Sequence, residues 1–286
     1  MALTINTNLG SLIVQKNLDD ATRALNKSIE RMTTGYKINS AGDDAAGYAV
    51  ATKMDTQLSS ISVAQDNVAI GSSMLSTAES NYDLISTHLQ RIRDLTEEAA
   101  NGTYGQDSID AIKAEIDARW QEIDRIAAST EFNGIKLMDG TGNPSTNGVT
   151  LQIGIDSSSN SQLKIDKAMF AKADGATLTG TTKATFLGYF TVGGTNYSTA
   201  LDKIDAALEA ITTRQTNIGA VQNRLDSAAD ALDVQYANVT SSLSTIRDAD
   251  VAAESSEYIK AQILQQASAS LLSTANQTPS IALNLI

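Results

Sequence analysis

Apolar residues recur along most of the chain at steps that alternate between three and four, which is the spacing of a coiled-coil seam. The first run predicts a helix from about Asp44 to Ala99, roughly 80 Å long at 1.5 Å per residue. A second run from Leu201 to Ile246 predicts a helix of similar length, and two such helices pack side by side at a shallow angle. The seam positions are Ile61, Ala64, Val68, Gly71, Leu75, Ala78, Tyr82, Ile85, Leu89, Ile92, Thr96 and Ala99, and then Leu201, Ile204, Leu208, Ile211, Gln215, Ile218, Gln222, Leu225, Ala229, Leu232, Tyr236, Val239, Leu243 and Ile246.

Shorter amphipathic helices are predicted beside the long pair. The turn "ANGTYGQDS" (100–108) contains Gly102 and precedes a helix whose N-cap we expect at Asp107 or Ser108. Both ends of the chain carry a seam that nothing obvious in the monomer would cover. Because short helices gain most of their stability from tertiary packing, we expect these ends to pair with each other and with neighbouring subunits. The three stripes are Ile109, Ile112, Ile116, Trp120, Ile123 and Ile126; Leu18, Ala21, Leu25, Ile29 and Met32; and Ile259, Ile263, Ala267 or Ser270, Leu271 and Leu272.

The middle of the chain departs from this pattern and is rich in glycine, serine, threonine and asparagine. Alternating apolar and polar residues in "GVTLQIGID" and "QLKID", separated by "SSSNS", predict a β-hairpin. The stretch "TFLGYFTVGGTNYS" (185–198) could add short strands. The predicted fold class is therefore mainly α, with long antiparallel helices in a coiled-coil or helical bundle and a small β-hairpin region inserted mid-chain.

Composition narrows the possible functions. The formal net charge is −12 and the sequence pI is about 4.5, so a nucleic-acid partner, which needs a basic face, is not expected. No stretch reaches the ~18 apolar residues of a membrane span, and the first residues do not read as a secretory signal peptide. These features indicate a cytoplasmic protein or one exported without a cleaved signal. Cysteine is absent, which excludes disulfides and thiolate chemistry.

Catalytic and metal-binding patterns are also missing from the sequence. His88 is the only histidine, whereas an H-E-x-x-H zinc motif needs two, and no G-x-S-x-G motif occurs. We expect His88 to be a surface or interface residue. We predict no enzymatic activity, no cofactor and no metal site.

The segment "INSAGDDAAGYAVATKM" (38–54) contains adjacent carboxylates, which fit either a metal or acid–base site or a joint between two helices. On a helix, Asp43 and Asp44 would point about 100° apart and would not converge on one ligand. At the start of a long helix, carboxylates accept unpaired backbone N–H groups and favour the positive end of the helix dipole. We therefore predict a joint, in which Gly35 and Gly42 let the chain bend.

Segments spread along the chain resemble bacterial flagellin, the subunit of the flagellar filament. They follow the order found in that family and include both ends of the chain. The segments are "SIERMTTGYKINSAGDDAAGYAVATKM" (28–54), "LQRIRDLTEEAANGT" (89–103), "AEIDARWQEIDRIAASTEFNGIKLMDG" (114–140), "IGAVQNRLDSAADAL" (218–232) and "KAQILQQASASLLSTANQTPSIALNLI" (260–286).

The resemblance implies a division of the chain into layers of a filament. Residues 1–42 and 248–286 would be terminal helices that form an inner coiled-coil core domain. Residues 43–140 and 200–247 would form a shell of long helices, and residues 141–199 a small β-hairpin insert that completes this shell. Many flagellins add large outer domains at this insert, so the chain looks like a short form.

The resemblance also implies a function and partners. The protein would be a structural subunit that is exported unfolded by the flagellar type III apparatus and polymerises into the filament for swimming motility. Its partners would be further copies of itself, an export chaperone, and the filament cap and junction proteins, but neither nucleic acid nor membrane. Its location would be extracellular, in the filament of the bacterial flagellum.

One segment resembles the part of flagellin that animal innate immunity senses. In flagellins bound by Toll-like receptor 5, an arginine and a leucine of this segment and a glutamate of the next helix make the contact, and they correspond to Arg91, Leu95 and Glu115. The other interpretation is a solvated charged face that pairs protofilaments, and the two roles are compatible. The sequence departs from the commoner pattern at Glu97 and Glu98, where neutral residues are usual.

The serine- and threonine-rich insert has two interpretations, a plain loop or a site of sugar attachment. Some flagellins carry O-linked sugars on such residues. The candidates for O-glycosylation here are Ser157, Ser158, Ser159, Thr181 and Thr182.

Three rival functions remain to be weighed against a filament subunit. A hook–filament junction protein has flagellin-like ends, but the "QNRLDS" segment and the C-terminal "LNLI" favour the filament subunit, and the number of copies per cell would decide. A secreted coiled-coil adhesin or effector would be absent from flagella. A flagellin with a catalytic insert is disfavoured because the insert is short and the chain has a single histidine.

Overall fold

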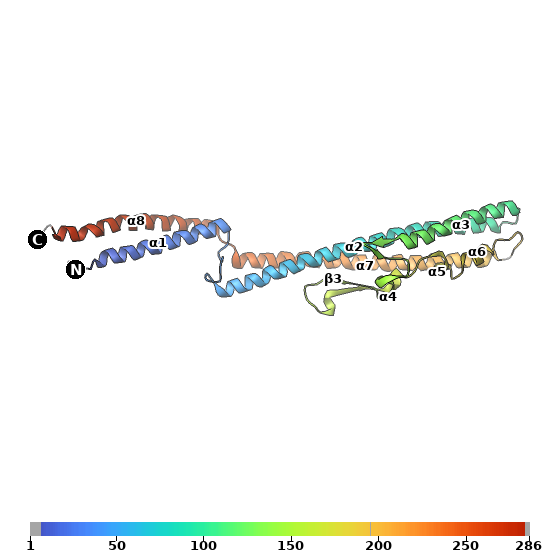
Figure 1. The fold of residues 1–286 in the computed structure, drawn as a ribbon, viewed down its shortest axis with the longest axis horizontal. Helices are drawn as coiled ribbons and strands as arrows, with labels where there is room; N and C mark the ends of the chain where they lie inside the picture. Colours follow the sequence, from blue (N-terminus) through green and yellow to red (C-terminus); the bar gives the residue numbers. More distant parts are fainter. Residues whose placement is uncertain (1–6, 195, 284–286) are drawn as a thin grey trace. The chain divides into compact units, whose positions relative to one another are not determined.

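The computed structural model describes residues 7–194 and 196–283, and Figure 1 shows its elements along the chain. The chain divides into two compact units, of which unit 1 is Met1–Leu58 with Ala237–Ile286 and unit 2 is Ser59–Tyr236. The elements are α1 Leu9–Thr34, α2 Ala45–Ala100, α3 Gln106–Ser129, β1 Glu131–Phe132, β2 Ile135–Lys136, α4 Gly142–Asn147, β3 Val149–Gln152, η1 Ser159–Ser161, β4 Gln162–Ile165, η2 Lys167–Phe170, α5 Gly175–Thr179, α6 Lys183–Leu187, α7 Tyr197–Arg247 and α8 Val251–Leu283.

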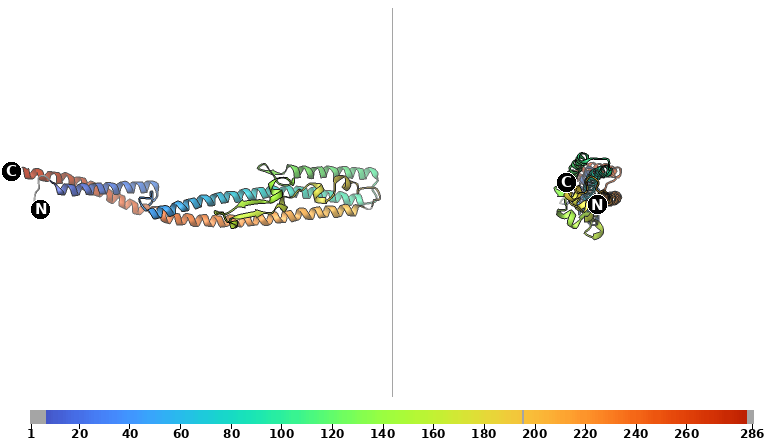
Figure 2. Two further views of the ribbon diagram at one scale, coloured as in Figure 1. Left: turned by 60° about the horizontal axis from the view of Figure 1, so that its bottom comes forward. Right: turned by 90° about the vertical axis from the view of Figure 1, so that its right-hand side faces the viewer.

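Unit 2 is built on α2 and α7, which run antiparallel to each other (Figure 2). Arg93 Nε donates to Asp205 Oδ1 over 2.7 Å, and Gln65 Nε2 donates to Asp233 Oδ1 over 2.6 Å. Every predicted seam position of α2 is buried, and those of α7 up to residue 232 are buried or half-buried. The two long helices are confirmed, and so are their seams as far as residue 232, because heptad spacing keeps one apolar stripe facing the partner helix. The predicted seam position Tyr236 is exposed.

Helix α3 packs its predicted isoleucine and tryptophan stripe into the same core, where all of these residues are buried. The helix begins earlier than expected, at Gln106, and its N-cap is Gly105, which makes no side-chain cap bond. The predicted caps Asp107 and Ser108 were therefore wrong. Both residues lie within the first turn, where the carboxylate of Asp107 still favours the positive end of the helix dipole.

The predicted β-hairpin is confirmed as strands β3 and β4, in which Val149 pairs with Ile165 and Leu151 with Leu163. It lies against α2, because Leu151 occupies the space that a side chain at Gly71 would need. The short β1–β2 hairpin just before it turns through a residue pair of positive φ, Asn133 and Gly134. Asn-Gly is the residue pair that such a tight turn prefers.

The short strands expected in 185–198 were wrong, since that segment contains the end of α6 and the start of α7 and has no strand among its described residues. Its aromatic residues form a cluster with the single tryptophan instead. The ring centroids of Phe186 and Trp120 lie 5.0 Å apart, and those of Phe186 and Phe190 lie 5.6 Å apart. Because each aromatic side chain buries a large area, such a cluster can hold a short segment against α3.

In unit 1 the helices α1 and α8 form an antiparallel pair, which confirms the expected pairing of the two ends. Asn8 Nδ2 donates to the carbonyl of Ala275 over 2.8 Å, and Gln265 Nε2 donates to Thr22 Oγ1 over 3.1 Å. Figure 1 shows both helices beside each other. The predicted stretch 260–286 ends in residues 284–286, which lie outside the described residues, as do residues 1–6 of the predicted terminal helix.

The seam between α1 and α8 agrees in part with the predicted one, because Ala21 is buried and Leu18, Leu25 and Leu272 are half-buried. The buried positions of the pair are small, namely Ala21, Ser28, Ala261 and Ser268. The prediction missed Ser28 and Ser268 because an apolar pattern passes over serine, although serine and alanine let two helices approach closely. Several large residues placed at the predicted seams are exposed instead, and these are Ile29, Met32, Ile259, Ile263 and Leu271.

Candidate functional sites

Helix α1 ends at Thr34. Gly35 is its C-cap and the first residue of the segment that leads to α2. Gly35 has the left-handed φ of 76°, and its N–H donates to the carbonyl of Arg31 over 2.8 Å. Glycine is the residue that adopts this conformation without steric cost, so the position requires it. Gly35, where we predict a bend, thus has a backbone conformation that favours glycine.

Backbone hydrogen bonds connect the segment that follows α1 to the segment between α7 and α8. Tyr36 forms a β-bridge with Asp248, Lys37 N–H donates to the Arg247 carbonyl over 2.6 Å, and Ala249 N–H donates to the Gly35 carbonyl over 2.9 Å. These backbone bonds join the exit of α1 to the entry of α8.

The side chain of Arg247 adds two contacts to these backbone hydrogen bonds. Its guanidinium pairs with Asp55 Oδ2 over 2.6 Å and lies 4.1 Å from the centroid of the Tyr36 ring. Both interactions are favourable, and the cation–π contact contributes about 0.5–1 kcal/mol at a partly exposed site. We call residues 35–47 together with 247–250 the joint.

Asp43 holds a turn in place and does not cap α2. Its Oδ2 accepts the N–H groups of Asn39 and Ser40 over 3.2 and 3.1 Å, and its Oδ1 lies 2.7 Å from Lys27 Nζ. The Lys27 ammonium and these two N–H donors lower the pKa of Asp43 to about 2. Asp43 therefore stays ionised well below neutral pH.

Asp44 is the N-cap of α2. Its Oδ1 accepts the N–H groups of Ala46 and Gly47 over 3.1 and 3.0 Å, which are two of the donors that a helix start leaves unpaired. A β-carbon on Gly47 would lie 2.6 Å from both Asp44 Oδ2 and Ile38 Cδ1, so these two side chains would have to shift to admit a larger residue there. Gly42 has no such requirement, because a β-carbon there would lie 3.5 Å from its nearest contact, Ser40 Oγ.

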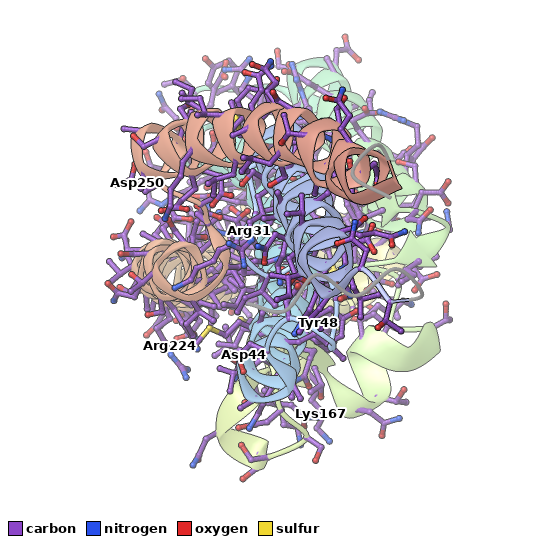
Figure 3. The ribbon with its side chains drawn as sticks, turned by 90° about the vertical axis from the view of Figure 1, so that its left-hand side faces the viewer. Arg31, Asp44, Tyr48, Lys167, Arg224 and Asp250 are labelled. Carbon is purple, nitrogen blue, oxygen red and sulfur yellow. The ribbon has the colours of Figure 1, made fainter. Side chains whose placement is uncertain are left out.

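Helix α8 starts with a matching aspartate. Asp250 Oδ1 accepts the N–H groups of Ala252 and Ala253 over 2.9 and 3.1 Å. Figure 3 labels Asp44 and Asp250 at the starts of their helices, and Arg31 between α1 and α8. Both helices that leave the joint are therefore capped by an aspartate side chain.

A cavity of about 590 Å³ opens at the joint, lined by Arg31, Lys37, Ile38, Asp44 and Val50 among others. Arg31 Nη1 lies 3.5 Å from Glu254 Oε2, and its buried Nε has no hydrogen-bond partner in the described part of the chain. Across those same residues, no group of three or more histidine and carboxylate side chains could hold a metal ion.

The structure brings Arg91 and Glu115 together on the α2–α3 surface. Arg91 donates through Nε and Nη2 to the two carboxylate oxygens of Glu115, over 3.0 and 3.4 Å. The hydrogen bond from Arg91 lowers the pKa of Glu115. Leu95 lies one turn along α2 but is only 2% exposed, so its side chain belongs to the core of unit 2 in the free chain.

His88 lies one turn before this pair and is half-buried. Its Nδ1 is buried and has no hydrogen-bond partner among the described residues. Burial lowers the pKa of His88, and the charge of Arg119 on α3 lowers it further. The imidazole is thus held neutral against α3.

The proposed sugar-bearing residues differ in accessibility. Ser157, Ser158 and Ser159 are exposed in the loop between β3 and β4, and the Ser158 hydroxyl donates to Asp156 over 2.7 Å. Thr182 is exposed at the N-cap of α6, and Thr181 is half-buried beside it.

The comparisons with known proteins agree along the whole chain. Residues 5–143 match the bacterial flagellin N-terminal helical region, and residues 201–286 match the bacterial flagellin C-terminal helical region. A flagellin of Listeria monocytogenes is 33% identical over 289 residues, which cover 99% of both chains. The chain belongs to the bacterial flagellin family. A flagellin of Bacillus subtilis is 34% identical to this flagellin over 303 residues, covering 99% of this chain and all of that one (100%).

A solved structure shares the fold of this flagellin. It is described as a flagellar hook-associated protein from Vibrio parahaemolyticus, with a TM-score of 0.60 and 17% identity, and it covers 72% of this flagellin and 100% of that chain. Flagellins are structural proteins of the flagellar filament, so this flagellin is a filament subunit and not an enzyme. No helix in the described ranges 7–194 and 196–283 is long and apolar enough to cross a membrane.

Sequence reasoning missed several residues of the joint in this flagellin. Asp250 precedes an apolar helix in the same way as Asp44 does, so the rule for N-caps could have found it. Lys27, Gly47 and Arg247 gave no local signal, because their roles depend on contacts with residues distant in the sequence or on space that only the fold defines.

Proposed function

We propose that the chain polymerises into a helical filament through the outer faces of α1 and α8. The supporting observation is an inversion of side-chain size. The fully buried positions of the two helices are alanine and serine, at Ala21, Ser28, Ala261 and Ser268, whereas many of their large apolar residues are exposed. The exposed set is Leu9, Leu12, Ile13, Ile29, Met32, Val251, Ile259, Ile263, Leu264 and Leu271.

Such a surface is costly in water. Leu12 is 63% exposed and Ile263 is 59% exposed, and fully burying an aliphatic side chain stabilises by about 1.5–3 kcal/mol. Contiguous apolar patches of this kind mark protein interaction sites. Further copies of the same chain, arranged around a helical axis, would cover these faces and order the terminal helices.

The predicted filament layers belong to this proposal. Residues 1–42 and 248–286 would form the inner core domain, and residues 43–140 and 200–247 the shell, completed by residues 141–199. The joint residues Gly35, Asp43 and Asp44 would then connect the two layers, with Gly42 in the turn between them. In support, the hydrogen bonds of Asp43 and Asp44 fix the path of the chain at this point.

Export and location follow as further parts of the proposal. The chain would leave the cell unfolded through the flagellar type III apparatus, escorted by a chaperone, and assemble outside the cell with cap and junction proteins at the ends of the filament. The small seam of the α1–α8 pair supports this, because a pair that buries so little apolar area is readily kept unfolded.

A second proposed role is recognition by Toll-like receptor 5. Arg91 and Glu115 form an exposed ion pair on the α2–α3 surface, which presents a fixed charge pattern to a partner. Leu95 would contribute to recognition indirectly, because its buried side chain keeps α2 in position beneath Arg91. For the insert we propose O-linked sugars at Ser157, Ser158, Ser159, Thr181 and Thr182, supported by the exposure of the loop serines.

Electron microscopy of the purified chain under polymerising conditions tests the main proposal. We expect smooth helical filaments from the wild type. Exchanging Leu12 and Ile263 for serine should raise the critical concentration about tenfold or more, because each exposed side chain would lose its burial in the filament.

Val192→Ser is the matched control, since Val192 is also an exposed apolar residue but lies in the insert. It should leave the critical concentration unchanged. If the intact wild-type chain stays monomeric under polymerising conditions, the proposal is wrong. If filaments form but cells contain only about a dozen copies, the junction protein becomes the better interpretation.

A further inference from the structure

A concave surface lies beside the β-hairpin of unit 2. Its volume is about 710 Å³, and it is formed by the β1–β2 hairpin, α4 and the adjoining ends of β3 and β4. We call it the hairpin groove, and its lining includes Ile135, Lys136, Pro144, Val149 and Lys164. The groove is therefore lined by three apolar side chains and two lysines, and the rest of its lining is glycine, threonine and asparagine.

The hairpin groove and the cavity beside it contain more lysines than carboxylates. Lys136 Nζ pairs with Glu131 over 2.9 Å, but Lys164 and Lys167 are exposed and make no ion pair among the residues that the structure describes. Lys167, labelled in Figure 3, lines an adjoining cavity together with Lys164. The carboxylate of Asp166, which lines the same cavity and caps η2, offsets one of these two charges. The surface that fits this groove has apolar side chains flanked by carboxylates.

Such a surface exists on α2 of the same unit. Val63, Ile70 and Leu84 are each more than half exposed and are spaced by multiples of seven residues, so they follow one side of the helix. Asp66 and Asp83 are exposed beside them. We call these five residues the α2 outer stripe. From residue 54 to residue 90 the sequence contains no lysine or arginine, so no side-chain cation of α2 offsets these charges there.

The outer face of α7 fits the groove less well. Glu209, Asp226 and Asp230 are exposed there, but the large apolar residues exposed on this helix are confined to its last part, at Val234 and Tyr236. An interface needs an apolar centre as well as complementary charge at its rim. The α2 outer stripe offers both over the same length of helix.

We propose that the hairpin groove of one copy binds the α2 outer stripe of a second copy. The proposal rests on the polymerisation proposed above and names one contact within it. The apolar residues of the stripe would be buried against Ile135 and Val149. Asp66 and Asp83 would approach Lys164 and Lys167. Because groove and stripe are different surfaces, the contact is head-to-tail, and a head-to-tail contact that does not close into a ring propagates as a filament.

Charge exchange tests this contact in the full-length chain. The double change Lys164→Glu with Lys167→Glu should raise the critical concentration for polymerisation about tenfold or more, and so should Asp66→Lys with Asp83→Lys. All four changes in one chain should return the critical concentration to within about threefold of the wild type, because the charges again complement each other. Pelleting and electron microscopy provide the readout.

The matched control combines the lysine changes with Asp226→Lys and Asp230→Lys on α7, and it should not restore assembly. Circular dichroism and the emission of Trp120 check that each variant is folded. If the glutamate variants fail to fold, Lys164→Gln with Lys167→Gln replaces them and should give a smaller rise.

Normal assembly of the folded lysine variants, no rescue by the α2 changes, or equal rescue by the α7 changes would each overturn the contact. In these cases the wild type still forms filaments, and the proposed function stands. A wild-type chain that never polymerises would overturn both.

Discussion

At the scale of single residues, adjacent side chains of the same type have different functions in this molecule. Asp44 accepts two N–H groups at the start of α2, as the sequence predicts for a carboxylate before a long helix. Asp43 was assigned the same function, but it closes the turn before the helix and pairs with Lys27. The difference lies in the backbone path through residues 39–43, which no local rule specifies.

The ion pair of Asp43 makes a prediction about pH. The pKa of Asp43 is about 2 in the folded chain, against an ordinary value of 3.8, so the unfolded chain binds this proton first as the pH falls. The stability that Asp43 contributes is therefore present above pH 3.8 and lost as the pH approaches 2. Asp43→Asn should lower the melting temperature of the unassembled chain at neutral pH, and the difference from the wild type should vanish toward pH 2.

Melting curves by circular dichroism across this pH range provide the measurement. Asp20→Asn is the control, because it removes an exposed carboxylate of α1 that, within the described part of the chain, pairs only with the exposed Arg23. A constant difference between Asp43→Asn and the wild type at all pH values would contradict the assignment.

At the scale of elements, the sequence predicted the seams between the long helices and only part of the seam between α1 and α8. The heptads of α2 and α7 are visible because apolar residues occupy most of the buried positions. The α1–α8 seam was predicted at Ala21 but missed at Ser28 and Ser268, which do not look like core residues. The segment from Phe186 to Phe190 was mistaken for a strand because aromatic residues favour strands, and here packing against Trp120 overrides that preference.

The N-cap of α8 can be tested at this scale. Asp250→Ala removes the acceptor for two N–H groups and should destabilise the α1–α8 pair by about 0.5–2 kcal/mol. Urea unfolding of the full chain, followed by helical circular dichroism, would show this as a lower midpoint. Asp226→Ala on the surface of α7 should leave the midpoint unchanged, and an equal loss in both variants would speak against a capping role.

At the scale of the whole molecule, the two units differ in how their apolar residues are placed. Unit 2 buries its largest side chains, including Trp120 and Tyr82, whereas unit 1 leaves most of its large aliphatic residues exposed. The sequence indicated this contrast, because the terminal seams had no evident cover within one chain. The division drawn from the sequence lies after residue 42 and before residue 248, whereas the boundaries of the two units fall inside α2 and α7.

Truncation tests this contrast. Deleting residues 1–30 or 260–286 should abolish filament formation and leave unit 2 folded, because its core does not depend on the terminal helices. Trp120 is the only tryptophan and is buried in unit 2, so its emission maximum should stay unchanged in either truncated chain. A red shift to the emission of a solvated indole would show that unit 2 needs the ends, contrary to the prediction.

The absence of lysine and arginine between Lys53 and Arg91 also determines how this region behaves in a protease digest. Trypsin has no bond to cut from residue 54 to residue 90, whatever the state of the chain, so the whole α2 outer stripe is released as one peptide ending at Arg91. Carbodiimide labels on Asp66 and Asp83 would therefore be found in a single fragment, together with any on Asp55 and Glu79, and fragmentation of that one peptide would locate them in free chains and in filaments alike.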